Sequence, residues 1–501
     1  MNRSRIVIKN TVFEMGYYLI VIALGFLAPR YIILTYGSSV NGLSTTITQI
    51  LNVILILQAG ATTAAVYELF KPIAEKDYEE ISRCIFSAKS FFKKVAFVFL
   101  AIMLVVSFVS TKYIDDNEIE SIYILFAFIL MGLKSFFDLL FTSKHRIIFT
   151  ADQSKYILSI MTLVEQIVYY ALVFLTIFLK LHFLCMYIAF LLSCIVKIVG
   201  LEVKYRKKYA NLPVYRGGKA RGIKGRSYSL ANEVAHSTVT SSITIIMSFM
   251  YNLEETSVYS IYTLISSALH LVSTAIYSSF APTFGNVVAA KEKDNSFRVF
   301  CIFQYVYIIF NVFLISCMLF LSVPFVRLYT NGVTDINYAD FVLAGLVSLQ
   351  SLFSVFRIPY NVVVSSCGLF KETWVQPVVC SVLSIGVSLV LGRLNYAFIL
   401  VGPIFFYFAN FMYQHIRLKK LVPHLISNKV FAYLGIGMFM LLGAYLFGGY
   451  SMILDGWIVW IIGASVCALI CFSLLLLLSC LIARKELKMS FNYFMELLKR
   501  K

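Results

Sequence analysis

Long apolar stretches recur along the whole chain and are separated by short polar segments. Four of them, residues 299–326, 373–392, 430–454 and 456–483, contain no charged residue. Each is long enough for a helix to cross a hydrocarbon core, which takes about 20 residues. The strands of a membrane β-barrel would instead alternate apolar and polar positions over about 10 residues, a pattern that this sequence lacks. The sequence therefore predicts an all-α polytopic membrane protein.

About fourteen such spans can be placed along the chain. A first group of six is followed by a basic connector without apolar periodicity, a second group of six and two additional spans. The predicted spans are 11–34, 40–70, 84–110, 119–141, 156–179, 182–203, 229–252, 256–284, 297–325, 339–364, 373–392, 395–416, 430–454 and 456–483. Four segments follow: an N-terminal six-helix bundle (1–203), a basic cytoplasmic linker (204–228), a C-terminal six-helix bundle (229–420), and two additional helices with a basic tail (421–501).

The two groups of six spans resemble an internal repeat. Lys76-Asp77 in one connection corresponds to Lys293-Asp294 in the second half, and Lys155 corresponds to Lys371 at nearly the same offset. Because each half contains an even number of spans, the repeat is parallel, with its axis along the membrane normal. A cavity is therefore expected between the halves.

The distribution of basic residues predicts the orientation. All but five of the 43 Lys and Arg residues fall on or near one set of alternating connections; the exceptions are Arg30, Lys112, Lys180, Arg327 and Arg393. Basic residues are retained on the cytoplasmic side during insertion. We therefore expect a multi-pass plasma-membrane protein with both termini in the cytoplasm. The basic tail from Arg484 is interpreted either as an amphipathic helix on the membrane or as a frayed end.

The composition limits the kinds of molecule that this protein is expected to bind. Hydrophobic residues make up 60% of the 501 positions, charged residues 14%, and the formal net charge is +18. Because the basic residues flank the spans, anionic lipid headgroups are the expected partner, and no nucleic-acid-binding module is visible. The ten cysteines include no CxxC pair, so we interpret them as small apolar side chains and expect neither disulfides nor a metal site.

Catalytic motifs are absent from the sequence. It contains no phosphate-binding loop, no HExxH and no GxSxG between a strand and a helix, and its six histidines are scattered. We therefore expect neither enzymatic activity nor a cofactor.

The chain resembles a known family at this level of organisation. Two six-helix halves, a basic connector, two extra helices and the opening sequence Asn10-Thr11-Val12-Phe13-Glu14 leading into residues 36–44 (YGSSVNGLS) are similar to the multidrug/oligosaccharidyl-lipid/polysaccharide (MOP) exporter superfamily. Within it, the chain looks like the Wzx-like polysaccharide-biosynthesis branch. That resemblance implies a flippase that moves undecaprenyl-diphosphate-linked oligosaccharide across the membrane by alternating access for capsule or other surface polysaccharide. It also implies a polysaccharide polymerase and glycosyltransferases as partners.

Charged and titratable side chains inside predicted spans indicate candidate sites, because a charge within a membrane usually faces protein or water. Lys134, Arg357 and His270 are the candidates for binding the diphosphate and sugars, since cationic groups stabilise phosphate. Two structural interpretations remain open: an internal ion pair between Lys134 and Asp138, and extension of Arg357 to the inner membrane surface. For His270, hydrogen-bonded packing is the alternative.

Three carboxylates inside predicted spans are candidates for binding a coupling proton or sodium ion: Glu14, Asp138 and Glu165. A desolvated carboxylate titrates at higher pH and can exchange its proton during alternating access. A structural ion pair or a position at a helix end explains each of them equally well.

Other functions compatible with the sequence are a multidrug transporter or a lipid II flippase of the same fold, and a membrane-embedded polysaccharide polymerase or glycosyltransferase. A transporter of cationic drugs favours an acidic cleft, whereas Lys134 and Arg357 are basic. A polymerase normally carries a large outer loop or a catalytic domain, and the predicted outer connections are short.

Overall fold

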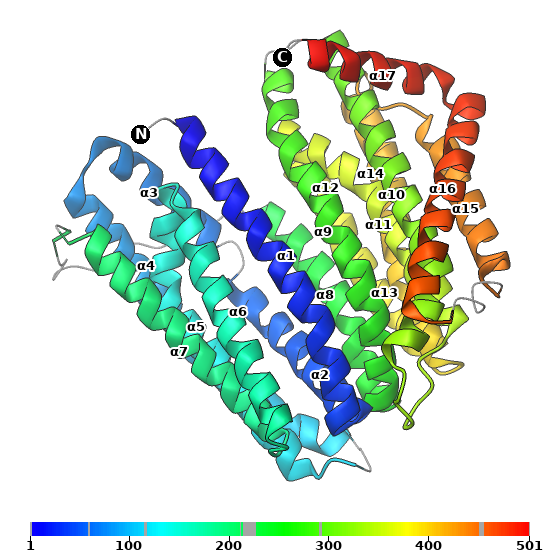
Figure 1. The fold of residues 1–501 in the computed structure, drawn as a ribbon. Helices are drawn as coiled ribbons and strands as arrows, with labels where there is room; N and C mark the ends of the chain where they lie inside the picture. The colour runs from blue at the N-terminus through cyan, green and yellow to red at the C-terminus, as the bar shows by residue number, and fades with distance from the viewer. Residues whose placement is uncertain are drawn as a thin grey trace. The chain divides into compact units, whose positions relative to one another are not determined.

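The computed structural model consists of α-helices joined by short connections (Figure 1). It describes residues 3–58, 61–114, 118–210, 212–213, 227–289, 293–449 and 455–499, with no strand among them. The prediction of an all-α polytopic membrane protein is confirmed. Ten of the described helices are long and apolar enough to cross a membrane, and two shorter apolar helices accompany them, Ile20–Tyr36 within α1 and Val430–Leu446.

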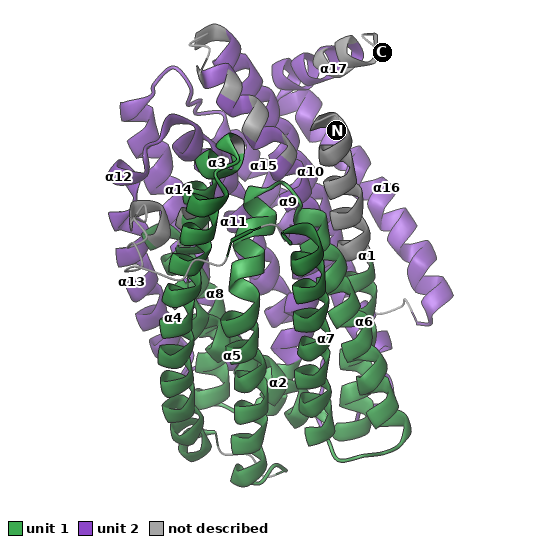
Figure 2. Cartoon of the chain, turned by 90° about the vertical axis from the view of Figure 1, so that its left-hand side faces the viewer, with its two compact units in different colours: residues 1–257 green, residues 258–501 purple. Residues whose placement is uncertain are grey.

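The helices form two compact units, Met1–Ser257 and Val258–Lys501 (Figure 2). The first unit contains α1 (Arg3–Tyr36), α2 (Ser38–Leu55), the short 3-10 helix η1 (Ile56–Gln58), α3 (Ala61–Glu75), α4 (Tyr78–Tyr113), α5 (Ser121–Ala151), α6 (Lys155–Phe178), α7 (Leu184–Lys208), α8 (Ser227–Met250) and the start of α9 (Leu253–Ala289). Within it, α5 packs against α4 and α7, α6 against α1 and α7, and α2 against α8.

The second unit contains the rest of α9, α10 (Lys293–Tyr329), α11 (Phe341–Cys367), α12 (Phe370–Thr373), α13 (Val375–Leu391), η2 (Tyr396–Leu400), α14 (Val401–Leu421), α15 (Val430–Leu446), α16 (Trp457–Ile482) and α17 (Arg484–Lys499). Here α14 packs against α11 and α13, and α10 contacts α11, α15 and α16. The basic tail is helical: α17 lies across the ends of α10 and α16 (Figure 1).

In the part of the chain that the structure describes, the predicted spans correspond largely to helical structure; residues 450–454 of the span 430–454 lie outside it, and the second span needs correction. Residues 40–70 do not form one continuous helix, because α2 tightens into the 3-10 turn η1 and a separate helix, α3, begins at Ala61. The boundary between the compact units at Ser257 places α8 with the first unit. The four segments predicted from the sequence stay a prediction. Residues 204–208 of the predicted linker continue α7, whereas 214–226 lie outside the described residues.

Local signals explain where several helices begin and end. Asp77 and Asp340 precede α4 and α11, and their carboxylates accept hydrogen bonds from the backbone amides of Glu80 and Leu343 at 3.0 and 2.9 Å. Such caps satisfy amides that have no partner within the helix. α11 ends at Gly368, whose φ of 70° belongs to the left-handed region that favours glycine.

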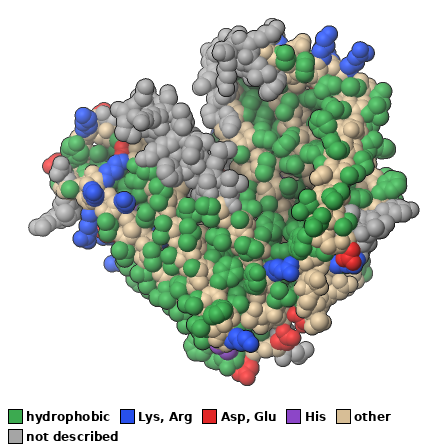
Figure 3. Space-filling view, viewed as in Figure 1, with side chains coloured by type: hydrophobic (Ala, Val, Ile, Leu, Met, Phe, Trp, Pro, Cys, Tyr) green, Lys and Arg blue, Asp and Glu red, His purple; other side chains and the backbone are tan. Residues whose placement is uncertain are grey.

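The exterior carries large apolar side chains, as expected where the solvent is lipid. Figure 3 shows hydrophobic side chains over most of the visible surface. On α16, Ile458, Leu469 and Leu481 are among the most exposed side chains. Its buried positions form a single stripe, Cys467, Cys471, Leu475 and Ser479, with a spacing of four residues. Exposure of this extent is normal for a helix in contact with hydrocarbon chains.

Close packing of α13 and α14 gives a first prediction, which concerns Gly402 in α14. A Cβ added at Gly402 would lie 2.2 Å from the carbonyl oxygen of Ser384, whereas one added at Gly386 in α13 would meet nothing within 4 Å. We expect Gly402→Ala to lower the free energy of unfolding by about 1–3 kcal/mol through overpacking. Gly386→Ala should be neutral or stabilising by up to about 1 kcal/mol. Unfolding in detergent measures the free energy of unfolding of both variants. Equal values would contradict the close contact between α13 and Gly402.

Candidate functional site

Five charged side chains form a continuous chain of ion pairs inside the first unit. The chain alternates in sign and runs Lys134, Glu165, Lys197, Asp138, Arg146, with N···O distances of 3.3, 2.9, 2.6 and 3.3 Å along it. The Glu165 side chain, which pairs with both Lys134 and Lys197, is only 2% exposed. Three positive and two negative charges leave this network with a formal charge of +1.

Three neighbouring helices supply this network. Lys134, Asp138 and Arg146 lie on α5, Glu165 on α6 and Lys197 on α7. Because residues four apart share a helix face, Lys134 and Asp138 point to the same side of α5. The ammonium group of Lys134 also lies 4.5 Å from the centroid of the Phe190 ring. Each carboxylate therefore has two cationic partners, which offsets the free energy needed to bury it.

Arg146 connects this network to a polar cavity of about 580 Å³ within the first unit. Gln49 and Asn52 of α2 and Glu233 and Ser241 of α8 are among the other residues that line it. The Arg146 side chain is 41% exposed, so a guanidinium that pairs with a buried carboxylate also faces the cavity. A cavity with such walls is suited to a hydrated, polar ligand.

Beyond the cavity, α2 and α8 close on each other along a seam of small polar residues. Ser241 donates a hydrogen bond to the Gln49 side chain at 2.9 Å, and the hydroxyls of Thr46 and Ser248 are hydrogen-bonded. Past the end of α8, the Asn41 amide donates to Ser257 at 2.8 Å. We call the residues 41–49 and 241–257 that meet here the α2–α8 seam.

Gly42 makes the closest approach in this seam. A Cβ at Gly42 would lie 1.8 Å from the carbonyl oxygen of Leu253, at the start of α9. Only glycine allows the two backbones to come this close. The seam is therefore tight at this end, and at its other end the hydrogen-bonded residues Gln49 and Ser241 also line the cavity.

Further ion pairs join α5 to α7 at the end of the first unit that the sequence assigns to the cytoplasm. Glu202 accepts from Lys144 at 2.7 Å and from Arg206 at 2.8 Å. Asp152 pairs with Lys208 at 2.6 Å and accepts a hydrogen bond from the Tyr209 hydroxyl at 2.7 Å. Burial and the neighbouring Asp152 carboxylate raise the pKa of Tyr209, so its phenol stays protonated. These contacts fix the relative position of the two helices that carry Lys197 and Asp138.

Arg357 is the principal buried cation of the second unit. Its residue is 6% exposed, its guanidinium carbon lies 5.7 Å from the centroid of the Tyr407 ring, and its Nε has no hydrogen-bond partner among the described residues. No carboxylate among the described residues forms an ion pair with Arg357. It is therefore buried in α11, which disfavours the interpretation that it extends to the membrane surface.

His270 lies close enough to Arg357 for electrostatic interaction. It lines a small cavity of about 10 Å³ in the second unit, together with Ser273 and Asn311, whose side chains are hydrogen-bonded to each other. That volume holds about one water molecule. Of the three residues predicted to bind substrate, Arg357 and His270 thus lie in the second unit. Lys134 belongs to the first unit.

The structure refines the other sequence-based expectations for individual residues. Asp138 and Glu165 lie in one network, whereas the Glu14 side chain is outside the described residues. Among the described residues, Lys134 forms its ion pair with Glu165 and not with Asp138. Sequence reasoning missed Lys197 and Arg146 as members of this network. Lys197 lies well inside an apolar run, and Arg146 is eight residues after Asp138, so the helical period alone contained part of the signal.

Comparisons with known proteins identify the fold. No protein-family model matches the sequence, and no curated protein matches it. Among solved structures, an inward-facing multidrug resistance MATE family transporter of the MOP superfamily has a TM-score of 0.64 at 11% identity, covering 82% of this chain and 98% of that chain. The lipid II flippase MurJ, in an inward closed conformation, has a TM-score of 0.59 at 15% identity, covering 95% and 99%.

A third structure, a MOP superfamily transporter from Pyrococcus furiosus whose binding pocket is described as having reverse polarity, has a TM-score of 0.50 at 12% identity, covering 84% and 97%. At these identities the likenesses show the fold alone. The chain therefore has the fold of MOP superfamily transporters over most of its length.

The ion-pair network gives a second prediction, which concerns Glu165. We expect Glu165→Gln to lower the free energy of unfolding by about 3 kcal/mol, because Lys134 loses its carboxylate and Lys197 keeps only one. The double variant Lys134→Met with Glu165→Gln should recover at least half of that loss. The double-mutant cycle compares the unfolding in detergent of the unchanged protein, Lys134→Met, Glu165→Gln and the double variant.

The exposed pair Lys71–Glu75 serves as the matched control, since both side chains are more than half exposed. Glu75→Gln should change stability by less than about 1 kcal/mol. Additive effects of the two substitutions at Lys134 and Glu165 would show that these side chains do not stabilise each other.

Proposed function

We propose that this protein is a flippase that moves undecaprenyl-diphosphate-linked oligosaccharide across the plasma membrane by alternating access, for surface polysaccharide biosynthesis. Both termini lie in the cytoplasm in this proposal. Glycosyltransferases supply the lipid-linked substrate and a polymerase consumes it. Arg357 and His270 contact the diphosphate or the sugars, and Lys134 acts in the same role from the first unit.

The observation that carries the proposal is Arg357, a buried guanidinium without a carboxylate partner among the described residues. Burying a charge without a partner is unfavourable, so such groups are retained mainly where they bind a ligand. A guanidinium binds phosphate oxygens through two parallel hydrogen bonds. A diphosphate therefore supplies the negative charge that the described protein interior does not.

The first unit supports the same substrate class. Its network has a surplus positive charge, and Arg146 presents a partly exposed guanidinium to a polar cavity of about 580 Å³. Glu233, which also lines this cavity, opposes an anion but offers a hydrogen-bond acceptor for sugar hydroxyls. Both features suit a ligand with an anionic diphosphate and a hydroxyl-rich sugar chain.

Coupling to an ion gradient is assigned in this proposal to Glu14, Asp138 and Glu165. Asp138 is the most accessible carboxylate of the network, at 17% exposure against 2% for Glu165, and it contacts Arg146 at the cavity. A proton or sodium ion that reaches Asp138 would compete with Lys197 and Arg146 for the same oxygens. A diphosphate that binds Arg146 would weaken the same Arg146–Asp138 pair from the other side, so that ion and substrate act on one ion pair.

The α2–α8 seam is the part of the first unit that we assign as the outer gate. It lies next to Gly37, in the connection that the basic-residue distribution places outside. Hydroxyl and amide side chains hold it together, and such contacts separate without exposing a large apolar surface. Opening of this seam would release the sugar chain to the outer side.

Two neighbours name the alternatives. MurJ is described as a lipid II flippase, so lipid II is one alternative substrate. The MATE family structure is described as a multidrug resistance transporter, so a drug is the other. Lipid II shares a diphosphate with the proposed substrate, so Arg357 favours both over a cationic drug. Only a transport assay separates the two lipid substrates.

The test of function is leaflet exchange in proteoliposomes that contain the purified full-length chain. Three fluorescent substrates are compared under proton and sodium gradients: undecaprenyl-diphosphate oligosaccharide, lipid II and a cationic dye. We expect protein-dependent exchange of the oligosaccharide. Exchange of lipid II alone, of the dye alone, or of none of them would overturn the proposal.

Arg357 gives a third prediction, in which activity and stability change in opposite directions. Arg357→Met should lower the rate of exchange at least about 10-fold, because a charge-assisted bidentate contact to the diphosphate is lost. The same substitution should raise the free energy of unfolding by about 1 kcal/mol, since a buried charge without a partner is removed.

Arg298, an exposed arginine on α10, provides the matched control, and Arg298→Met should leave both quantities unchanged. Arg357→Lys should keep part of the exchange rate, because the charge remains while the two-pronged geometry is lost. A destabilised Arg357→Met protein with normal exchange would assign this residue to the structure alone.

A fourth prediction tests the gate. Cysteines introduced as Asn41→Cys and Ser257→Cys, at two positions whose native side chains are hydrogen-bonded at 2.8 Å, should become cross-linked by a short thiol reagent. The cross-linked protein should lose exchange, and a reducible cross-link should restore it on reduction. The controls are the two variants that carry only one of the introduced cysteines, treated identically. Full exchange by protein proven to be cross-linked would show that the seam does not open during transport.

A further inference from the structure

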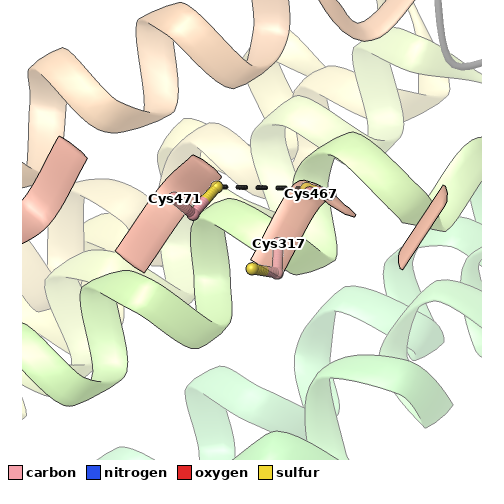
Figure 4. A group of neighbouring side chains, drawn as sticks. All are labelled: Cys317, Cys467 and Cys471. Carbon is pink, nitrogen blue, oxygen red and sulfur yellow. Dashed lines mark hydrogen bonds between the residues drawn. The ribbon is translucent and has the colours of Figure 1, made fainter. Parts of the chain in front are cut away.

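Three cysteines from two helices of the second unit converge on one point. Cys317 lies on α10 and Cys467 and Cys471 lie on α16, and their three Sγ atoms all fall within 4.8 Å of one another. Figure 4 shows the three side chains, with the contact between Cys467 and Cys471, at 3.9 Å, drawn as a dashed line. The sequence places Cys317 some 150 residues before the other two, so spacing alone does not reveal this group.

The placement of these cysteines on α16 is selective. Only four side chains of α16 are buried, and Cys467 and Cys471 are two of them, each 8% exposed. By contrast, Cys480 on the same helix is exposed. Packing alone accounts for small side chains at a helix contact, and cysteine serves as a small apolar residue there. Packing does not, however, require that the thiols of three cysteines meet at one place.

The distances fit a metal ion bound by three sulfur atoms. Metal–sulfur bonds of about 2.3 Å in a trigonal plane place the sulfur atoms about 4 Å apart. One pair is already separated by 3.9 Å, and the other two need only small side-chain rotations within the 4.8 Å limit. Among the described residues, no histidine, aspartate or glutamate joins the group as a fourth ligand.

The ligand set and the surroundings select a soft monovalent ion. Structural zinc is almost always four-coordinate, whereas thiolates select Cu(I) among the soft ions and tolerate a lower coordination number. A Cu(I) ion with one thiolate and two neutral thiols carries no net charge, and its binding releases one proton. Neutrality matters here, because α10 and α16 are both long and apolar enough to cross a membrane, where a net charge is unfavourable.

We propose that Cys317, Cys467 and Cys471 form a Cu(I)-binding site that links α16 to α10. A bound ion would connect α16, one of the two helices outside the predicted twelve-helix repeat, to α10, which belongs to that repeat. The site is separate from Arg357 and from the transport proposal, so either can fail without the other.

The test is a copper titration of the purified full-length protein in detergent, without oxygen and with a reductant present. Bicinchoninate, a coloured Cu(I) chelator, competes for the ion and reports how much copper the protein binds. We expect one Cu(I) per chain, with a thiolate-to-copper charge-transfer band in the ultraviolet. Each of Cys317→Ser, Cys467→Ser and Cys471→Ser should weaken binding more than about 100-fold, beyond the range for loss of a group that only supports a ligand.

Matched controls come from the same two helices. Cys480→Ser on α16 and Cys301→Ser on α10 should bind copper like the unchanged protein. Gel filtration and a copper-free thermal unfolding curve establish that each variant is folded. The proposal is overturned by absence of stoichiometric binding, by binding that survives when all three cysteines are replaced with Ala, or by equal loss in the control variants. Each of these results would assign the three thiols to apolar packing.

Discussion

The unfavourable transfer of charge into a hydrocarbon environment is the constraint on which this structure depends. In the first unit it is met by alternation: Lys134, Glu165, Lys197, Asp138 and Arg146 neutralise one another in sequence across α5, α6 and α7. The two carboxylates each have two cationic neighbours, and the remaining positive charge faces a polar cavity. Local pairing thus explains why these charges are tolerated, and the surplus of one positive charge explains why the Arg146 guanidinium remains available at the cavity.

In the second unit the same constraint is not met by pairing. Arg357 is buried beside the Tyr407 ring, and a cation–π contact returns only part of the hydration that a guanidinium loses. We therefore expect the buried Arg357 side chain to lower the stability of the protein that contains it. The anionic cargo of the proposed function would account for such a residue, because charged side chains within membrane spans usually serve a function.

Small residues have a complementary part in the architecture. Gly42 lets the α2 backbone touch the start of α9, and hydroxyl side chains such as Thr46 and Ser248 join α2 to α8. Large apolar side chains face outward, as Ile458 and Leu469 do on α16. Because lipid offers these apolar groups an equally favourable environment, helix contacts depend on close packing and hydrogen bonds rather than on hydrophobic burial.

The sequence by itself determined the helical membrane class and the approximate position of most of the apolar helices, because apolar length is a local property of the chain. It also indicated that Lys134, Asp138, Glu165 and Arg357 are exceptional, since a charge within an apolar run is visible without any structure. Only tertiary structure decided the partners: Lys134 pairs with Glu165 rather than with its near neighbour Asp138, Lys197 and Arg146 join them, and Cys317 meets Cys467 and Cys471. Those contacts depend on how separate helices rotate and pack against one another, and one sequence does not encode that rotation in any short-range pattern.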